Sequence, residues 1–228
     1  MNLLTLDFRG VIAGLLLAVA FLVFGGSLGL FFVIAMLYFL IVSSIVTHAG
    51  KESKKGMHLY QKSRSIRNVA ANGIPPLLFA LLFFFSGMHY SHAIATVAVI
   101  GFAGSIAAVT SDKFSSEIGV LDGTPHSIVN FKAVKKGVSG GITVLGLASG
   151  LAGAMLMSLI LIPLPYIYAG VAIGIAAEAV IIAGFIGTLI DSFLGYFEEK
   201  GIGTKYTTNF ICGIAGGLIG MLLYSIIV

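Results

Sequence analysis

Charged residues are scarce in this chain of 228 residues, at 10% of the total against about 25% in ordinary soluble domains. With 58% hydrophobic residues and a mean hydropathy of +1.07, the chain could not cover the surface of a soluble fold, so we expect an integral membrane protein. The single cysteine, Cys212, excludes a disulfide framework and a CxxC metal site. The net charge of +4 is too small and too scattered to indicate binding of nucleic acid.

The charged residues that are present, Glu178 excepted, fall into four segments: 7–9, 51–67, 112–136 and 191–205. Because a helix needs about 20 apolar residues to span the hydrocarbon core, the stretches 10–50, 68–111 and 137–190 each hold two spans, and 206–228 holds one. Turn residues at 25–27, 86–92 and 163–165 divide the pairs. The sequence therefore predicts an all-α polytopic helical bundle of about seven transmembrane helices, near 10–25, 28–48, 73–87, 92–110, 140–162, 166–190 and 207–227.

Each pair of spans leaves and returns to the same side, so all four charged segments are expected on one face of the membrane. Lys and Arg dominate the segment 51–67, which makes that face cytoplasmic by the positive-inside rule and places the N-terminus inside. The whole chain, 1–228, is interpreted as one integral membrane domain in contact with lipid. Its oligomeric state stays open, a homo-oligomer included.

Asp112 ends one predicted span, and Glu117 follows it in a loop that is long enough to suggest a function. On a continuous helix the two carboxylates would lie about 140° apart, too far to share one metal easily. A break in the helix or separate roles would resolve this. Carboxylates beside the hydroxyls of Ser115 and Ser116 suit Mg²⁺, which prefers oxygen ligands and shares them with phosphates. The alternative is a solvated loop that only caps the helix.

A glycine cluster, Gly137–Gly141 with Ser139 inside it, opens the fifth predicted span and follows Lys132 and Lys135. Helix N-termini carry free N–H groups and partial positive charge, and glycines let a phosphate approach the backbone, which indicates an anion site. The alternative interpretation is a helix-packing face with lysines that extend toward the membrane surface.

Arg67, Asn68 and Asn72 lead into the third predicted span, and the two asparagines share one helix face. They are candidates for binding a phosphate or a base. As a helix cap and a positive-inside anchor they need no other explanation, and both interpretations stay open.

A parallel repeat is suggested by Gly101–Ser105 and Gly184–Thr188, each followed by an Asp-x-Phe motif. The repeat would divide the chain into 92–162 and 166–228, and it would bring Asp112 and Asp191 to the same depth, where two aspartates from two helices could bind a metal. Glu178 is the one charge inside a predicted span; it is interpreted as structural, with proton transfer or a lipid cavity as alternatives.

These segments together resemble one integral-membrane family, which includes human transmembrane protein 19 and the phytyl-phosphate kinase of plants and cyanobacteria. The matching motifs are 67–73 (RNVAANG), 111–119 (SDKFSSEIG), 132–146 (KAVKKGVSGGITVLG) and 187–195 (GTLIDSFLG). Lys113 and Val138 both stand where the family pattern has Thr. The resemblance implies CTP-dependent phosphorylation of an isoprenyl monophosphate, such as phytyl or geranylgeranyl phosphate, to the diphosphate.

On this hypothesis the catalytic residues are Asp112, Glu117, Asp191 and Lys132, and the three carboxylates bind Mg²⁺. The phosphates and the CTP would contact a larger set: Arg67, Asn68, Asn72, Ser115, Ser116, Lys135, Gly137, Ser139, Gly140, Gly141 and Ser192. The partners are then an isoprenyl phosphate lipid and a nucleoside triphosphate, at a site facing the cytoplasm. Two alternatives stay open: a transporter or lipid flippase that uses Glu178, and a CTP-dependent lipid cytidylyltransferase.

Overall fold

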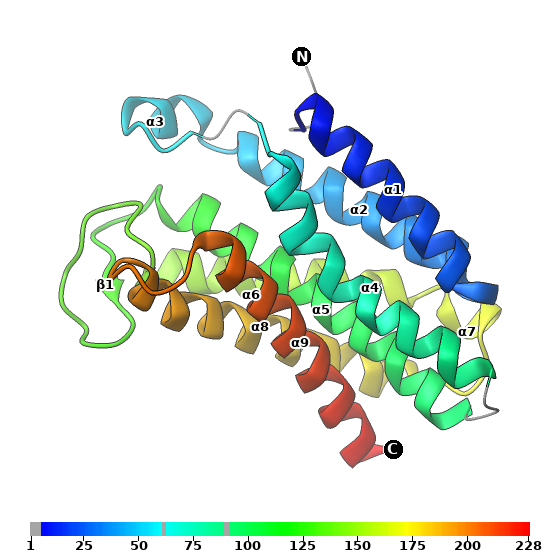
Figure 1. Cartoon of the computed structure of the whole chain (residues 1–228). Coiled ribbons are helices and arrows are strands. Elements are labelled where there is room, and N and C mark those ends of the chain that lie inside the picture. The colour runs from blue at the N-terminus through cyan, green and yellow to red at the C-terminus, as the bar shows by residue number, and fades with distance from the viewer. Residues whose placement is uncertain (1–5, 61–62, 89–91) are drawn as a thin grey trace.

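The computed structural model describes residues 6–60, 63–88 and 92–228, and most of these are helical (Figure 1). The long helices are α1 (Phe8–Phe24), α2 (Gly29–His48), α4 (Ile66–Met88), α5 (His92–Gly119), α6 (Val144–Ser158), α8 (Ile173–Glu198) and α9 (Lys205–Ile227). Short elements connect them: η1 (Gly26–Leu28), α3 (Lys51–Gly56), β1 (His126–Ser127), β2 (Gly141–Ile142), η2 (Leu159–Leu161) and α7 (Leu164–Ile167).

Within the described residues, 6 helices are long and apolar enough to cross a membrane: Gly26–His48, Ile66–Gly87, His92–Gly119, Val144–Ile167, Ile173–Glu198 and Lys205–Ile227. The apolar helix α1 has 17 residues, which is at the short end of the range for a membrane span. The prediction of an all-α polytopic membrane bundle is therefore confirmed.

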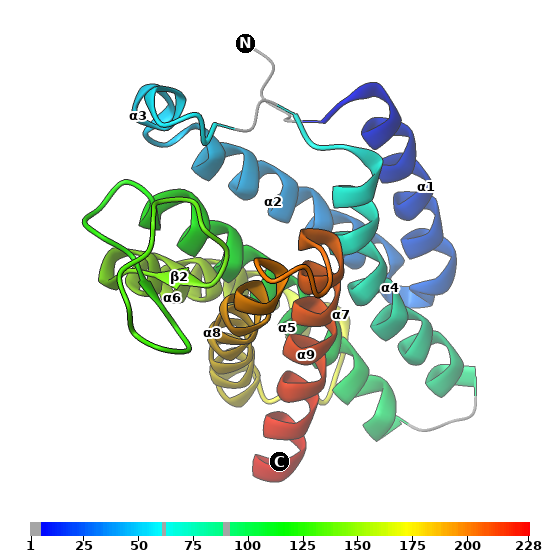
Figure 2. The same cartoon turned by 60° about the vertical axis from the view of Figure 1, so that its left-hand side comes forward.

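Helix α5 lies at the centre of the bundle and packs against α4, α6, α8 and α9 (Figure 2). Every residue from 101 to 111 is buried, although this segment carries few large side chains. Small residues allow the close contacts: a Cβ added at Gly104 would lie 2.6 Å from the carbonyl oxygen of Gly216 on α9. Van der Waals contact between closely spaced backbones is what holds helices together in lipid.

An aromatic cluster fills the end of the bundle away from the charged segments. Phe21 of α1, Phe32 of α2, Phe83 of α4 and Phe102 of α5 are all buried. The rings of Phe32 and Phe102 lie 4.2 Å apart between centroids, and Phe21 meets Phe102 edge to face at 5.7 Å. Such pairs add to the stabilisation from burial alone, so this end of the bundle is a packed core.

The helix bounds differ from the predicted ones mainly at the charged end. Helix α5 continues without a break to Gly119, and α4 begins at Ile66 and runs through Pro75 and Pro76. Prolines are tolerated in membrane helices where a neighbouring helix packs on them, and Gly213 of α9 lies directly against Pro75. As a result, the Asp112–Glu117 segment and the Arg67–Gly73 segment are both helical.

The described parts of the four charged segments gather at one end of the bundle, as the order and directions of the helices require (Figure 1). The N-terminus of α1, the segment between α2 and α4, the loop after α5 and the turn between α8 and α9 all lie there. Polar side chains from distant parts of the sequence therefore share one surface.

Candidate functional site

A polar cavity of about 240 Å³ opens at the charged end of the bundle. Its wall is formed by the last turns of α5 and α8, the first turns of α9, α3 with the segment that follows it, and the loop 120–143. The charged residues in the wall are Lys54, Asp112, Lys113, Glu117, Asp191, Glu198 and Lys205. We refer to this space as the polar cavity.

Asp112 of α5 and Asp191 of α8 meet in the polar cavity, with their carboxyl groups within hydrogen-bonding reach of each other. Asp191 Oδ1 is buried and has no hydrogen-bond partner. Just below, Thr188 Oγ1 donates to Ser111 Oγ at 2.6 Å, which fixes the two helices at the same depth. Two adjacent negative charges repel each other, so this pair favours a cation or a shared proton between its oxygens.

Lys205 supplies positive charge next to this pair. It is the first residue of α9, is exposed, and lines the polar cavity. Its ammonium group attracts both Asp112 and Asp191 electrostatically. The first turn of a helix adds partial positive charge of its own, so this side of the cavity favours an anion.

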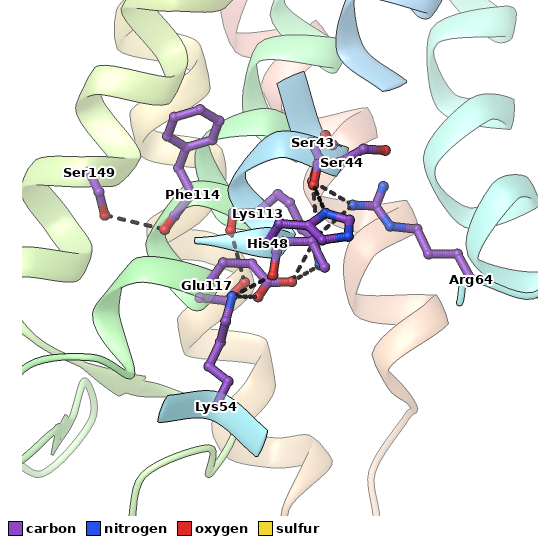
Figure 3. Close-up of polar contacts among 11 residues, drawn as sticks. Ser43, Ser44, His48, Lys54, Arg64, Lys113, Phe114, Glu117 and Ser149 are labelled. Carbon is purple, nitrogen blue, oxygen red and sulfur yellow. Dashed lines mark hydrogen bonds and ion pairs between the residues drawn. The ribbon is translucent and has the colours of Figure 1, made fainter. Parts of the chain in front are cut away.

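Glu117 lies on a different face of α5 and is held by two lysines (Figure 3). Lys54 Nζ, from α3, lies 2.7 Å from Glu117 Oε2 and 2.7 Å from the carbonyl oxygen of Thr47. Lys113, one turn before Glu117, forms an ion pair with Oε1, and the hydroxyl of Thr47 also contacts that oxygen at 3.1 Å. Both carboxylate oxygens of Glu117 are therefore occupied by protein donors.

Arg64 extends this network toward α2. Its Nη2 donates to the carbonyl oxygen of Ser43 at 2.9 Å and to Thr47 Oγ1 at 3.1 Å (Figure 3). The side chain is 7% exposed. Burial lowers the pKa of the Arg64 guanidinium, and the charge of Glu117 acts in the opposite direction. Arginine stays protonated under all ordinary conditions, so Arg64 places a permanent positive charge here.

The glycine segment 137–141 was expected to start a helix, but it is a loop that ends in β2. Helix α6 begins at Val144, with Thr143 as its N-cap. Gly140 has φ +79°, and a Cβ there would lie 2.7 Å from the backbone nitrogen of Tyr196 on α8. Only glycine fits so close to another backbone at positive φ. The packing interpretation therefore holds for Gly140, which at the same time lines the polar cavity.

Most of the predicted site residues come together in the wall of the polar cavity. They are Asp112, Ser115, Ser116, Glu117, Gly137, Ser139, Gly140, Gly141, Asp191 and Ser192. They come from three segments that lie far apart in the sequence, 112–117, 137–141 and 191–192.

Five predicted residues lie elsewhere. Lys132 and Lys135 are exposed on the loop and do not line the polar cavity, and Arg67 is exposed with its guanidinium 5.9 Å from the centre of the Tyr206 ring. Asn68 and Asn72 line a second, apolar cavity. The two lysines lie in the loop between β1 and β2, outside both strands, and the sequence pattern did not reveal this antiparallel pairing.

A three-carboxylate metal site is not formed, because the described residues contain no group of three or more His, Cys, Asp or Glu side chains able to hold a metal ion. The Asp112–Asp191 pair nevertheless fits Mg²⁺. This ion is usually held by one or two carboxylates, with water and substrate phosphates as the other ligands, and Asp191 Oδ1 has no other partner.

Sequence reasoning missed Lys54, Glu198 and Lys205. Glu198 accepts from Ser139 Oγ at 3.3 Å and from Thr208 Oγ1 at 3.2 Å, and so ties the glycine loop to α9. No motif marks these residues. The one available signal was their membership of the charged segments, which predicted that they share a face of the membrane. Glu178 is exposed on α8 and lines neither cavity.

Comparison with known proteins agrees with this architecture. The model of a family described as integral membrane protein DUF92 matches residues 1–212. An uncharacterized membrane protein of Methanocaldococcus jannaschii is 39% identical over 222 residues, which cover 96% of this chain and 86% of that protein. Protein PGR of Arabidopsis thaliana is 31% identical over 208 residues, or 84% of this chain and 71% of PGR. No solved structure matches. The chain therefore belongs to the DUF92 family of integral membrane proteins, as the resemblance predicted.

Proposed function

We propose that this protein is a CTP-dependent kinase that converts an isoprenyl monophosphate into the diphosphate. An oxygen of the lipid phosphate attacks the terminal phosphorus of CTP. The bond from that phosphorus to the bridging oxygen breaks, and its electron pair leaves on CDP. The acceptor oxygen is already anionic near neutral pH, so the reaction needs positioning and neutralisation of charge more than it needs a base.

One observation carries the proposal: Asp112 and Asp191 meet in a polar cavity that also contains cations. Carboxylates from two helices, lysines and a glycine loop form the set of groups that phosphoryl transfer uses. Asp191 Oδ1 is buried and has no hydrogen-bond partner, so it can still accept a cation or a donor from a ligand.

The side chains of the cavity then have distinct tasks. Asp112 and Asp191 would hold Mg²⁺, which neutralises charge on the phosphates when it is bound. Lys205 and the first turn of α9 attract the triphosphate of the nucleotide. Glu117 holds Lys54 and Lys113 in the wall of the cavity, where their ammonium groups raise the positive potential.

The charged end of the bundle is proposed to face the cytoplasm, because the segment 51–67 is rich in Lys and Arg. A nucleoside triphosphate would then reach the polar cavity directly from the cytosol. The lipid would reach the same end from within the bilayer.

The most direct test incubates the purified protein with Mg²⁺, CTP and geranylgeranyl phosphate, and measures CDP and the lipid diphosphate. We expect one CDP for each lipid diphosphate, and the same yield from the wild type as from Glu178→Gln. Asp112→Asn and Asp191→Asn should each reduce turnover by about 100-fold or more.

The same assay separates the alternatives. A cytidylyltransferase would release inorganic diphosphate and form a CMP-linked lipid, with no CDP. A flippase that uses Glu178 would lose activity in Glu178→Gln and keep it in Asp112→Asn. Absence of CDP with every isoprenyl phosphate offered would contradict the kinase proposal.

A further inference from the structure

A second cavity, of about 100 Å³, lies between α1, α2 and α4. Its wall is apolar over most of its length, with Gly14, Leu17, Ala18 and Phe21 from α1 and Val33, Met36, Leu37, Phe39 and Leu40 from α2. We refer to this space as the apolar groove. Leu37 in its wall is 51% exposed, so the groove adjoins the apolar outer surface of the bundle, which is the surface that faces lipid.

One end of the groove is polar, and it is the end nearest the charged segments. Arg64, Asn68 and Asn72 line it there. Arg64 is buried, and in the described part of the chain it belongs to none of the ion pairs; its Nη2 donates only to a carbonyl and a hydroxyl oxygen. Asn68 is buried too, and its Nδ2 makes one long bond, 3.4 Å, to Ser65 Oγ. The charge of Glu117 also acts on Arg64, but Glu117 is already paired with two lysines. A buried cation that forms no ion pair of its own favours an anionic ligand.

Two contacts join this polar end to the polar cavity. Asn209 Nδ2, in the wall of the polar cavity, donates to Asn72 Oδ1, in the wall of the groove, at 3.1 Å. Thr47 bridges Arg64 on one side and Glu117 on the other. An anion at the polar end of the groove would therefore lie next to the space proposed for the nucleotide.

We propose that the apolar groove is the acceptor site, and that it binds the isoprenoid chain of a single-chain lipid monophosphate with the phosphate at Arg64, Asn68 and Asn72. This inference rests on the proposed function and adds to it the place of the lipid. The occupant follows from the two halves of the groove. One half is an apolar slot between three helices that adjoins the lipid face, and the other is a polar end whose positive charge, Arg64, forms no ion pair with the described residues.

The test uses a geranylgeranyl monophosphate that carries a diazirine on its chain, added to the full-length protein in nanodiscs without nucleotide. After irradiation, labelled peptides are located by mass spectrometry. We expect labels on α1, α2 or α4. Labels confined to α6 or α8 would overturn the proposal.

A steric variant tests the groove itself. Gly14 lines the groove, and a Cβ there would meet no atom within 4 Å, so Gly14→Phe adds a bulky side chain at the groove without a clash at its Cβ. Gly174 of α8 is exposed, and a Cβ there would likewise meet no atom within 4 Å, so Gly174→Phe is the control. We expect Gly14→Phe to reduce labelling by about tenfold or more, with no change in Gly174→Phe; equal labelling of both variants would contradict the proposal.

A charge variant tests the polar end. Asn68→Asp keeps the shape of the side chain and adds a negative charge. It should weaken binding of the monophosphate probe and leave a matching geranylgeraniol probe unaffected, because only the former carries an anion. Equal loss of both probes, or competition by phosphatidic acid as strong as that by unlabelled geranylgeranyl phosphate, would overturn the assignment.

These measurements need no turnover. Labels in the groove without formation of CDP would leave the lipid site in place and refute the kinase reaction. Formation of CDP with labels outside the groove would support the kinase reaction and overturn the lipid site.

Discussion

The ammonium group of Lys54 is buried against Glu117, with Nζ 2.7 Å from Oε2 and the lysine side chain 1% exposed. This contact joins α3 to α5 across a separation of 63 residues. Through this ion pair, Glu117 holds α3 in place as part of the wall of the polar cavity.

Loss of the Lys54 side chain should destabilise the protein. Lys54→Met leaves Glu117 with Lys113 alone, and breaking a buried ion pair costs about 3 kcal/mol. The neighbouring Lys55, paired with Glu52 on the surface, provides the control: Lys55→Met should change stability by no more than about 0.5 kcal/mol. Unfolding by denaturant in mixed micelles measures both. Equal stability of the two variants would show that the Lys54–Glu117 pair does not hold the wall.

The contact between Asp112 and Asp191 predicts a trade between stability and activity. Asp191→Asn removes repulsion between like charges and gives Asp112 an amide partner, so without Mg²⁺ its melting temperature should equal or exceed that of the wild type. Its turnover should fall at the same time. A variant that is both unstable and inactive would indicate that the pair serves only the fold.

The charge pattern predicted the most about this molecule. Long apolar stretches without charge are typical of membrane spans, so the pattern predicted the polytopic bundle, together with the gathering of four charged segments at one end. The suggested repeat, on two spans that run in the same direction, also predicted that Asp112 and Asp191 lie at the same depth. The predicted repeat, 92–162 and 166–228, stays a prediction.

The partners of individual side chains were not predictable. Asp112 and Glu117 lie on one continuous helix and so point in different directions, and only the packing of α3 shows that Lys54 occupies Glu117. Lys132 and Lys135 looked like phosphate ligands because they precede a glycine cluster. The structure leaves both lysines exposed and outside the wall of the cavity. Which residues of a loop line a cavity depends on how the whole loop folds back on the bundle, and no local pattern encodes that.

The close approach of Gly140 to α8 gives another prediction. Gly140→Ala combines positive φ with a clash against the backbone of Tyr196, and should cost about 2 kcal/mol. Gly123 is exposed on the same loop with open space around it, so Gly123→Ala should be neutral within about 0.5 kcal/mol. Melting temperatures in detergent compare the two. A neutral Gly140→Ala would mean that the loop does not pack on α8 as described.

The Asn72–Asn209 bond should couple the two cavities. In a double-mutant cycle, Asn72→Ala and Asn209→Ala should show an interaction of about 1 kcal/mol in stability. Asn72→Ala combined with Asn130→Ala, on the exposed loop, should be additive. An additive result for Asn72 and Asn209 as well would show that this hydrogen bond does not couple the groove to the polar cavity.

The central claim is that Asp112 and Asp191 receive a metal-bound triphosphate in the polar cavity, and titration calorimetry of CTP into the purified full-length protein tests it most directly. In Mg²⁺ the wild type and Glu178→Gln should bind CTP with equal affinity, and chelation of the metal should abolish binding. Asp112→Asn and Asp191→Asn should bind about tenfold more weakly or worse. Binding that is unaffected by Mg²⁺ and by both substitutions would contradict the account.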